Sequence, residues 1–162
     1  MDQPAGFSSS TRAALARAET QCAIAGQRLT ALRRDVLGVI LEAAAPVGAY
    51  EILDRLRASR GGAAPPSVYR ALDFLSAQGL VHRVERLAAF VPCVADSAPE
   101  AHAHAAQFLI CRDCGRTIEL ADPALSAALA AAAARRGFAV AAVTIEAEGR
   151  CQACAEREGG VA

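Results

Sequence analysis

The sequence predicts an α+β protein of two small domains, and three observations predict it. Apolar residues recur three to four positions apart in several stretches of the first half, which is typical of amphipathic helices. Two stretches of alternating residues follow around a short turn, which indicates a β-hairpin. Two Cys-x-x-Cys pairs enclose most of the remaining chain, so we expect a second domain built around four cysteines.

The first domain is expected to span residues 1–94 and to begin with a disordered segment, residues 1–10, which is rich in Ser, Gly and Pro. Thr30 can cap the second of its helices, and Gly79 can end the fourth. A Pro-Val-Gly run separates the second helix from the third. The apolar spacing predicts these helices over residues 11–25, 31–44, 49–59 and 67–78.

The hairpin is predicted from strands at residues 80–85 and 88–94, with Arg86 and Leu87 at the turn. Short helices followed by a two-stranded hairpin make a winged helix, the helix-turn-helix variant whose second helix enters the DNA major groove. The same order of elements also occurs in domains that never touch DNA. The fold alone therefore does not fix the function.

The second domain is expected at residues 104–162, after a hinge linker at residues 95–103 that lacks periodicity. Asp122 can cap its one predicted helix, which Gly137 ends. A sheet with open edges and a single helix would be covered most simply by a second copy of itself, so we expect a homodimer. The predicted strands are residues 105–110, 115–120 and 138–146, and the helix is residues 123–136.

The four paired cysteines indicate a structural zinc site. Two Cys-x-x-Cys turns that face each other supply the four thiolates that tetrahedral Zn²⁺ prefers. A site closed by four protein ligands leaves no position for a substrate, so the metal would hold the fold together rather than catalyse. Two disulfides or a redox pair are the alternative, but each disulfide would close only a tight loop. The ligands are Cys111, Cys114, Cys151 and Cys154.

A second set of possible metal ligands straddles the linker. His82 and Cys93 lie on the two predicted hairpin strands, where the register can bring them side by side. His104 and Glu119 lie beyond the linker, and His102 could replace His104. Two imidazoles, one thiolate and one carboxylate suit Zn²⁺. Spacing alone is weak evidence, because a lone histidine on a strand is more often a surface residue.

Composition excludes several classes of protein. The 162 residues include no apolar run near the ~20 that span a bilayer, and the start of the chain has no charged region followed by an apolar one. We therefore expect a cytoplasmic protein with no membrane partner. Six cysteines without a secretion signal favour metal binding or redox chemistry over a disulfide framework. Neither a carboxylate pair nor a Gly-rich phosphate loop is found, so we expect no enzyme and no small-molecule substrate.

Four residues of the predicted winged helix are candidates for DNA contact. The net charge is zero and gives no argument for nucleic acid, but 11 arginines stand against 8 acids up to Ala95, and 6 against 9 from Asp96. Arg70 near the start of the second helix of the helix-turn-helix is well placed for a guanine edge or a phosphate. The alternative is that these tyrosines pack at the edge of the core and the arginine is solvated. The candidates are Tyr50, Ser67, Tyr69 and Arg70.

Several motifs together resemble the ferric uptake regulator family, and within it the zinc uptake regulator (Zur) branch. The resemblance covers residues 11–156 and includes both Cys-x-x-Cys pairs. The other motifs that carry it are Arg28-Leu29-Thr30, the run Pro65-Pro66-Ser67-Val68-Tyr69-Arg70-Ala71-Leu72-Asp73-Phe74-Leu75 and the run Gly79-Leu80-Val81-His82-Arg83-Val84-Glu85.

The resemblance implies a dimeric winged-helix repressor, with DNA binding in the N-terminal half and dimerisation with structural zinc in the C-terminal half. It implies a DNA-reading tyrosine and arginine at Tyr50 and Arg70. A zinc-loaded dimer would bind palindromic operator DNA and repress zinc-uptake genes, with two zinc ions per chain. The implied regulatory ligands, drawn from both domains, are His82, Cys93, His104 and Glu119.

Two alternatives stay open beside this interpretation. The first is a family member that senses iron, manganese or peroxide. Ala101-His102-Ala103-His104 stands where the iron-sensing branch has a denser His-His-Asp-His run, and a thiolate at Cys93 favours zinc over ferrous iron. The second is a zinc-binding module without a DNA role, or a thiol redox protein that uses Cys22 or Cys93.

Overall fold

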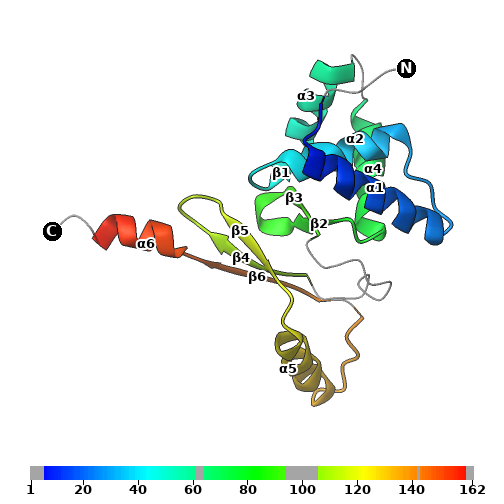
Figure 1. Ribbon diagram of the computed structural model, residues 1–162. Helices are drawn as coiled ribbons and strands as arrows, with labels where there is room; N and C mark the ends of the chain where they lie inside the picture. The colour runs from blue at the N-terminus through cyan, green and yellow to red at the C-terminus, as the bar shows by residue number, and fades with distance from the viewer. Residues whose placement is uncertain (1–5, 61–63, 94–105, 142, 160–162) are drawn as a thin grey trace. The chain divides into compact units, whose positions relative to one another are not determined.

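The computed structural model describes residues 6–60, 64–93, 106–141 and 143–159. The chain divides into two compact units, Met1–Cys93 and Val94–Ala162 (Figure 1). Each unit has its own three-stranded sheet. Within the described ranges, every helix is too short or too polar to cross a bilayer.

The first unit is a winged helix, as the sequence predicts. Its four helices are followed by an antiparallel hairpin of β2 (Val81–Val84) and β3 (Ala89–Pro92). A short strand β1 (Val47–Gly48), where the sequence predicted only a break, also pairs with β3, so the strand order is β1-β3-β2. The helices are α1 (Ser9–Ile24), α2 (Ala31–Glu42), α3 (Ala49–Arg60) and α4 (Pro65–Ala77).

One apolar core joins these helices to the hairpin. In α4 the buried residues Val68, Ala71, Leu72 and Leu75 recur three to four positions apart, so one face of this helix is in the core and the other faces outward. Pro65 begins the helix, where its fixed φ suits the first turn. The fully buried side chains of the unit include Leu15, Val36, Leu37, Ile40, Ile52, Leu56, Leu72, Leu75 and Val81.

The disorder predicted for residues 1–10 is wrong for residues 7–10. Ser8 caps α1, because its Oγ accepts a hydrogen bond from the amide of Thr11 at 3.2 Å. The amide of Ser8 donates to Glu42 at 2.8 Å. The Phe7 ring packs on Gly38, where a Cβ would come within 2.3 Å of it. A lone aromatic residue in a polar segment gives no periodic signal, so its distant partner cannot be predicted.

The wing turn is longer than predicted. A 3₁₀ turn over Glu85–Leu87 and a left-handed residue, Ala88 with φ 46°, connect β2 to β3. The register pairs His82 with Val91, and the amide of Cys93 donates to the carbonyl of Leu80 at 3.1 Å.

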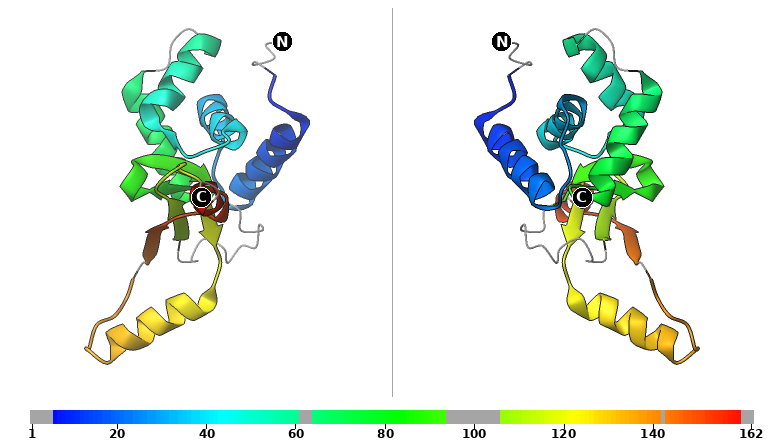
Figure 2. Two further views of the ribbon diagram at one scale, coloured as in Figure 1. Left: turned by 90° about the vertical axis from the view of Figure 1, so that its left-hand side faces the viewer. Right: turned by 90° about the vertical axis from the view of Figure 1, so that its right-hand side faces the viewer.

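The second unit is a three-stranded sheet with one helix beyond each end. The strand order is β5-β4-β6, with β5 antiparallel and β6 parallel to β4. Figures 1 and 2 show α5 at the end where β5 finishes and α6 at the end where β6 finishes. The elements are β4 (Ala106–Cys111), β5 (Thr117–Leu120), α5 (Pro123–Ala134), β6 (Thr144–Gly149) and α6 (Gln152–Gly159).

One strand prediction for this unit is wrong, and one helix was not predicted. The third strand, predicted at residues 138–146, is observed as β6 at Thr144–Gly149. Phe138 is 67% exposed and Val140 is 36% exposed, so the apolar residues at the start of the predicted strand are not buried in the described chain. The helix α6 was not predicted, because a polar helix of only eight residues gives little apolar periodicity.

Candidate metal centre and nucleic-acid interface

The four paired cysteines come together in the second unit. Their sulfur atoms all lie within 4.8 Å of one another, and the sulfurs of Cys114 and Cys151 are 3.8 Å apart. A disulfide needs about 2.05 Å, and all six cysteines of the chain are free. Four sulfurs at about 2.3 Å from a zinc ion would lie about 3.8 Å from one another at the tetrahedral angle. The donor set and its spacing therefore fit zinc.

Backbone hydrogen bonds position these cysteines. The parallel register of β4 and β6 places Gly149 opposite Cys111, and the amide of Arg112 donates to the carbonyl of Gly149 at 2.9 Å. Gly115, with φ +70°, closes the first Cys-x-x-Cys turn by donating its amide to the carbonyl of Cys111. Cys154 lies in α6, which begins directly after Cys151. The sheet thus delivers both thiol pairs to one place.

The thiols at this centre differ in acidity. The amide of Cys151 donates to Cys111 Sγ at 3.3 Å and, with the amides of Cys114 and Asp113, lowers the pKa of Cys111 to about 6. Hydrogen bonding with Cys151, followed by burial, raises the pKa of Cys154 to about 12. Four crowded sulfurs cannot all ionise beside one another without a cation, because like charges disfavour the ionised form. A bound divalent ion supplies that missing charge.

Charged side chains lie close to the two cysteine pairs along the chain. Arg150 Nε and Asp113 Oδ2 form an ion pair of 2.5 Å that joins the two Cys-x-x-Cys turns. Arg157 in α6 donates from Nη2 to Cys154 Sγ at 3.2 Å. Asp113, Arg150 and Arg157 were not among the residues predicted from the sequence. All three lie inside a cysteine pair or within three residues of one, and this position could have marked them as neighbours of the metal. It is a weak signal, because a charged residue beside a metal site is more often solvated than structural.

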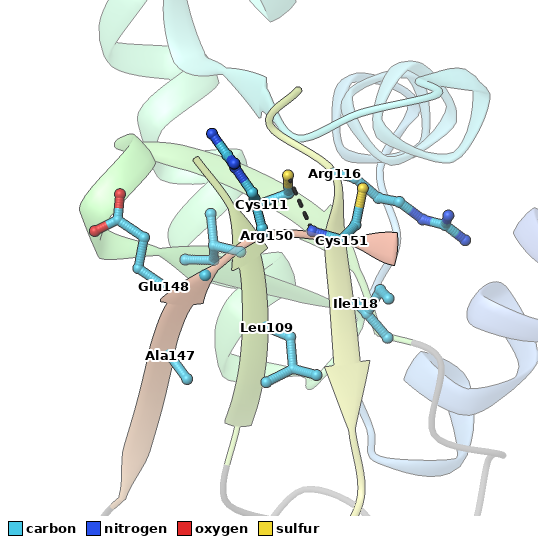
Figure 3. Close-up of a pocket in the computed structure, with 10 residues that line it drawn as sticks. Leu109, Cys111, Arg116, Ile118, Ala147, Glu148, Arg150 and Cys151 are labelled. Atoms are coloured by element: carbon cyan, nitrogen blue, oxygen red, sulfur yellow. Dashed lines mark hydrogen bonds between the residues drawn. The ribbon is translucent and has the colours of Figure 1, made fainter. Parts of the chain in front are cut away.

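An apolar face of the sheet is open next to this centre. Figure 3 shows a pocket with Leu109, Ile118 and Ala147 along it and Cys111 and Cys151 at one end. Leu109 is 42% exposed and Ile118 is 40% exposed. Apolar side chains gathered on one face beside charged ones are typical of a surface that binds a partner.

His82 and Cys93 lie close together in the first unit. Because His82 is opposite Val91, Cys93 lies diagonally across the hairpin on the same face. Their ligand atoms are within 4.8 Å, and both residues are half-buried. The prediction that the hairpin register brings this imidazole and thiol together is confirmed for the described chain.

The other two candidate ligands are in the second unit. Glu119 lies on β5 opposite Phe108 and is half-buried. His104, like its possible substitute His102, lies outside the described residues. Their assignment to the same site as His82 and Cys93 stays a prediction.

The residues predicted to contact DNA lie on α3 and α4. Tyr69 is 45% exposed and Arg70 is exposed, on the side of α4 that faces away from the core. Tyr50 is 74% exposed in the first turn of α3. Ser67 is half-buried in the first turn of α4. The tyrosines therefore do not fill the core of this unit, which leaves them available to a partner.

The fold and the site define a class: a winged-helix protein with a cysteine metal centre in a second α+β unit. The family model described as "Ferric uptake regulator family" matches residues 24–148. The chain belongs to the ferric uptake regulator family, in its zinc uptake regulator branch.

Several known proteins are similar over most of the chain. The zinc uptake regulation protein of Escherichia coli (strain K12) is 40% identical over 148 residues, which are 91% of this chain and 85% of that protein. The structure of a zinc uptake regulator complexed with zinc and DNA matches with a TM-score of 0.87 and 39% identity, over 94% of this chain and 99% of that one. The crystal structure of holo XcZur matches with a TM-score of 0.79 and 43% identity, over 88% and 96% of the two chains.

Proposed function

We propose that this protein is a zinc-responsive transcriptional repressor, which binds palindromic operator DNA as a zinc-loaded dimer and represses zinc-uptake genes. One observation carries the proposal: a winged helix with an exposed recognition face and a four-thiol centre occur in one chain, and a relative of 39% identity with this fold is a zinc uptake regulator complexed with zinc and DNA. The protein would act in the cytoplasm and catalyse no reaction.

We assign two zinc ions to each chain. Cys111, Cys114, Cys151 and Cys154 would hold one ion permanently, because four thiolates close its coordination shell. His82, Cys93, His104 and Glu119 would hold the second, regulatory ion. Thiolate, imidazole and carboxylate are the ligands that zinc binds in proteins, and it binds four of them in a tetrahedron.

The regulatory residues would act by restricting the hinge. His82 and Cys93 present donors from the wing, while Glu119 and His104 present theirs from beyond the linker at residues 95–103. When the four share one ion, the separation of the two recognition helices in the dimer is held at one value. When they do not, only a fraction of molecules has the separation that the operator accepts, and apparent affinity falls by that fraction.

The DNA-reading residues would lie on α3 and α4. Arg70 offers a planar fork of donors that matches the O6 and N7 acceptors of guanine. Tyr50, Ser67 and Tyr69 would contact phosphates or base edges beside it and fix the register of the helix. The exposure of Tyr50, Tyr69 and Arg70 supports this assignment.

A second copy of the chain is the proposed partner of the apolar face in the second unit. No residue of α5 is buried in the described chain, and Leu125 and Leu129 are about as exposed as Leu109 and Ile118 on the sheet face. Burial of these side chains would supply the hydrophobic stabilisation that this small unit lacks.

The test is operator binding at controlled free metal. Fluorescence anisotropy should show that zinc, at a lower free concentration than ferrous iron or manganese, drives the protein onto palindromic promoter DNA. Cys93→Ala should reduce this zinc response at least about tenfold, because one of four ligands is lost. Cys22→Ala removes a buried thiol of the winged helix and is the matched control.

Each other outcome has a definite meaning. A response to iron or manganese alone would place the protein among the other metal sensors of its family. An unchanged zinc response in Cys93→Ala would contradict the regulatory site. If the protein bound no promoter with any of these metals, a zinc-binding module without a DNA role or a thiol redox protein would become the better interpretation.

A further inference from the structure

The charge of the four-thiolate centre has to be balanced by the protein. Four thiolates around one Zn²⁺ leave a net charge of minus two in a site where Cys111 and Cys154 are only 3% and 5% exposed. Burial of such a charge is unfavourable unless hydrogen bonds and opposite charges surround it. The groups that donate to the sulfurs therefore influence how firmly the ion is held.

Arg157 donates a hydrogen bond to one of the four sulfurs and brings a positive charge close to it. It lies three residues after Cys154 in α6, a spacing that puts both side chains on one face of the helix. Its Nη2 donates to Cys154 Sγ at 3.2 Å, and its Nε donates to the carbonyl of Ala153 at 3.1 Å. The second hydrogen bond fixes the guanidinium plane, so the charged donor does not have to be ordered when the metal binds.

Two other described contacts at the centre differ in kind from this one. The Cys151 amide serves Cys111 and is a neutral donor. Arg150 forms an ion pair with the Asp113 carboxylate, which balances part of its charge. A charge-assisted hydrogen bond is roughly twice as strong as a neutral one.

We propose that Arg157 is a positioning residue of the structural zinc centre, whose guanidinium neutralises part of the Cys154 thiolate and slows release of the ion. This inference rests on the zinc occupancy proposed above. Loss of an outer-shell partner of this kind lowers metal retention by about 10- to 100-fold.

The experiment measures zinc transfer from the full-length chain to excess EDTA. A Cys93→Ser background confines the signal to the four-cysteine site. In that background Arg157→Met, which keeps the length of the side chain and a good helix propensity, should release zinc about tenfold faster. Arg157→Gln keeps a neutral donor, so its rate of zinc release should lie between those of Arg157→Met and the Cys93→Ser parent. Arg157→Lys keeps the charge, so its rate should be nearest to that of the parent. Gln152→Ala breaks the Gln152–Glu156 hydrogen bond on the same helix and is the matched control.

Alkylation separates this role from simple loosening of the helix. Iodoacetamide forms an S–C bond with a thiolate and releases iodide, and mass spectrometry locates the modified cysteine. The reaction is followed on the zinc-loaded chain before appreciable zinc is released. Arg157→Met should then speed modification of Cys154 selectively over Cys114, because the zinc-bound Cys154 sulfur loses a charged hydrogen-bond donor and becomes more nucleophilic, whereas a loosened fold would speed both.

Three results would overturn the inference. One is a release rate in Arg157→Met equal to that of Gln152→Ala. Another is equal acceleration of modification at Cys154 and Cys114. In both cases a parent chain that still holds zinc leaves the proposed function intact. A parent chain without zinc at this centre would instead overturn the proposed occupancy, and this inference with it.

Discussion

Arg70 and Arg157 show at the scale of single residues how position decides what an arginine does. Arg70 projects from the outer face of α4, so its charge and five donors stay available to a molecule outside the chain. Arg157 is tied to a sulfur and a carbonyl in its own helix. The same side chain can therefore read a partner or stabilise a buried charge, and the local contacts distinguish the two.

Replacement of Arg70 tests the reading role. Arg70→Ala should weaken operator binding by about 1–3 kcal/mol and relax the preference for guanine at one position of each half-site. Arg70→Lys should recover little, because an ammonium does not bind guanine bidentately. Anisotropy titrations with the operator, and with a version substituted at that guanine, measure both effects.

Arg136→Ala, an exposed arginine after α5, is the control for loss of one positive charge. Arg70→Ala could instead lower the affinity equally for all DNA sequences and reduce the slope of log affinity against log salt by about one. That result would show that Arg70 contacts phosphate.

At the scale of elements, the strongly periodic helices of the first unit could be predicted and the second unit only in part. The helix α4 buries one stripe of its surface, and this burial produces the apolar spacing in the sequence. The helix α2 is buried on all sides over the six consecutive residues from Asp35 to Ile40, which a one-sided apolar spacing does not predict. The start of β6 could not be predicted, because the parallel register with β4 sets it, and a distant pairing leaves no local pattern. The anchoring of Phe7 by Gly38 is hidden for the same reason.

The candidate sites show the same division. The cysteine spacing predicted the four-thiol centre, because ligand geometry restricts spacing within each pair. The contacts of Asp113, Arg150 and Arg157 depend on how β4, β6 and α6 meet, so the sequence did not reveal them. The proximity of His82 and Cys93 followed from the hairpin, since strand pairing is local there.

The ion pair between Asp113 and Arg150 links the two elements that carry the thiol pairs. Its side chains are each about one third exposed, so we expect a contribution below that of a fully buried pair. In a double-mutant cycle of Asp113→Asn and Arg150→Met, zinc affinity measured by chelator competition should show a coupling of about 0.5–1 kcal/mol.

The exposed pair Glu51–Arg55 on α3 provides the comparison. A cycle of Glu51→Gln and Arg55→Met there should leave zinc affinity unchanged. Zero coupling between Asp113 and Arg150 would mean that backbone pairing of β4 with β6 alone brings the cysteines together.

At the scale of the whole molecule, the second unit leaves several large apolar side chains exposed. Leu125 and Leu129 are four residues apart on α5, so they lie on one face of that helix, and they are 40% and 43% exposed. Both β5 and β6 are edge strands in the described chain. Burial of this surface against a second copy would also place two winged helices on one molecule, which matches the two-fold symmetry of a palindromic operator.

Leu125→Asp with Leu129→Asp tests this assembly. If the helix face is the dimer interface, two apolar contacts worth about 1.5–3 kcal/mol each are lost, and the dimer Kd should rise by at least about 100-fold. Sedimentation equilibrium measures the shift, and circular dichroism checks that α5 stays helical. Leu87→Asp, an exposed leucine of the wing turn, should leave the dimer intact. A double variant that stays dimeric would place the interface elsewhere. A monomeric variant should still bind half-sites weakly, because each winged helix is a separate compact unit.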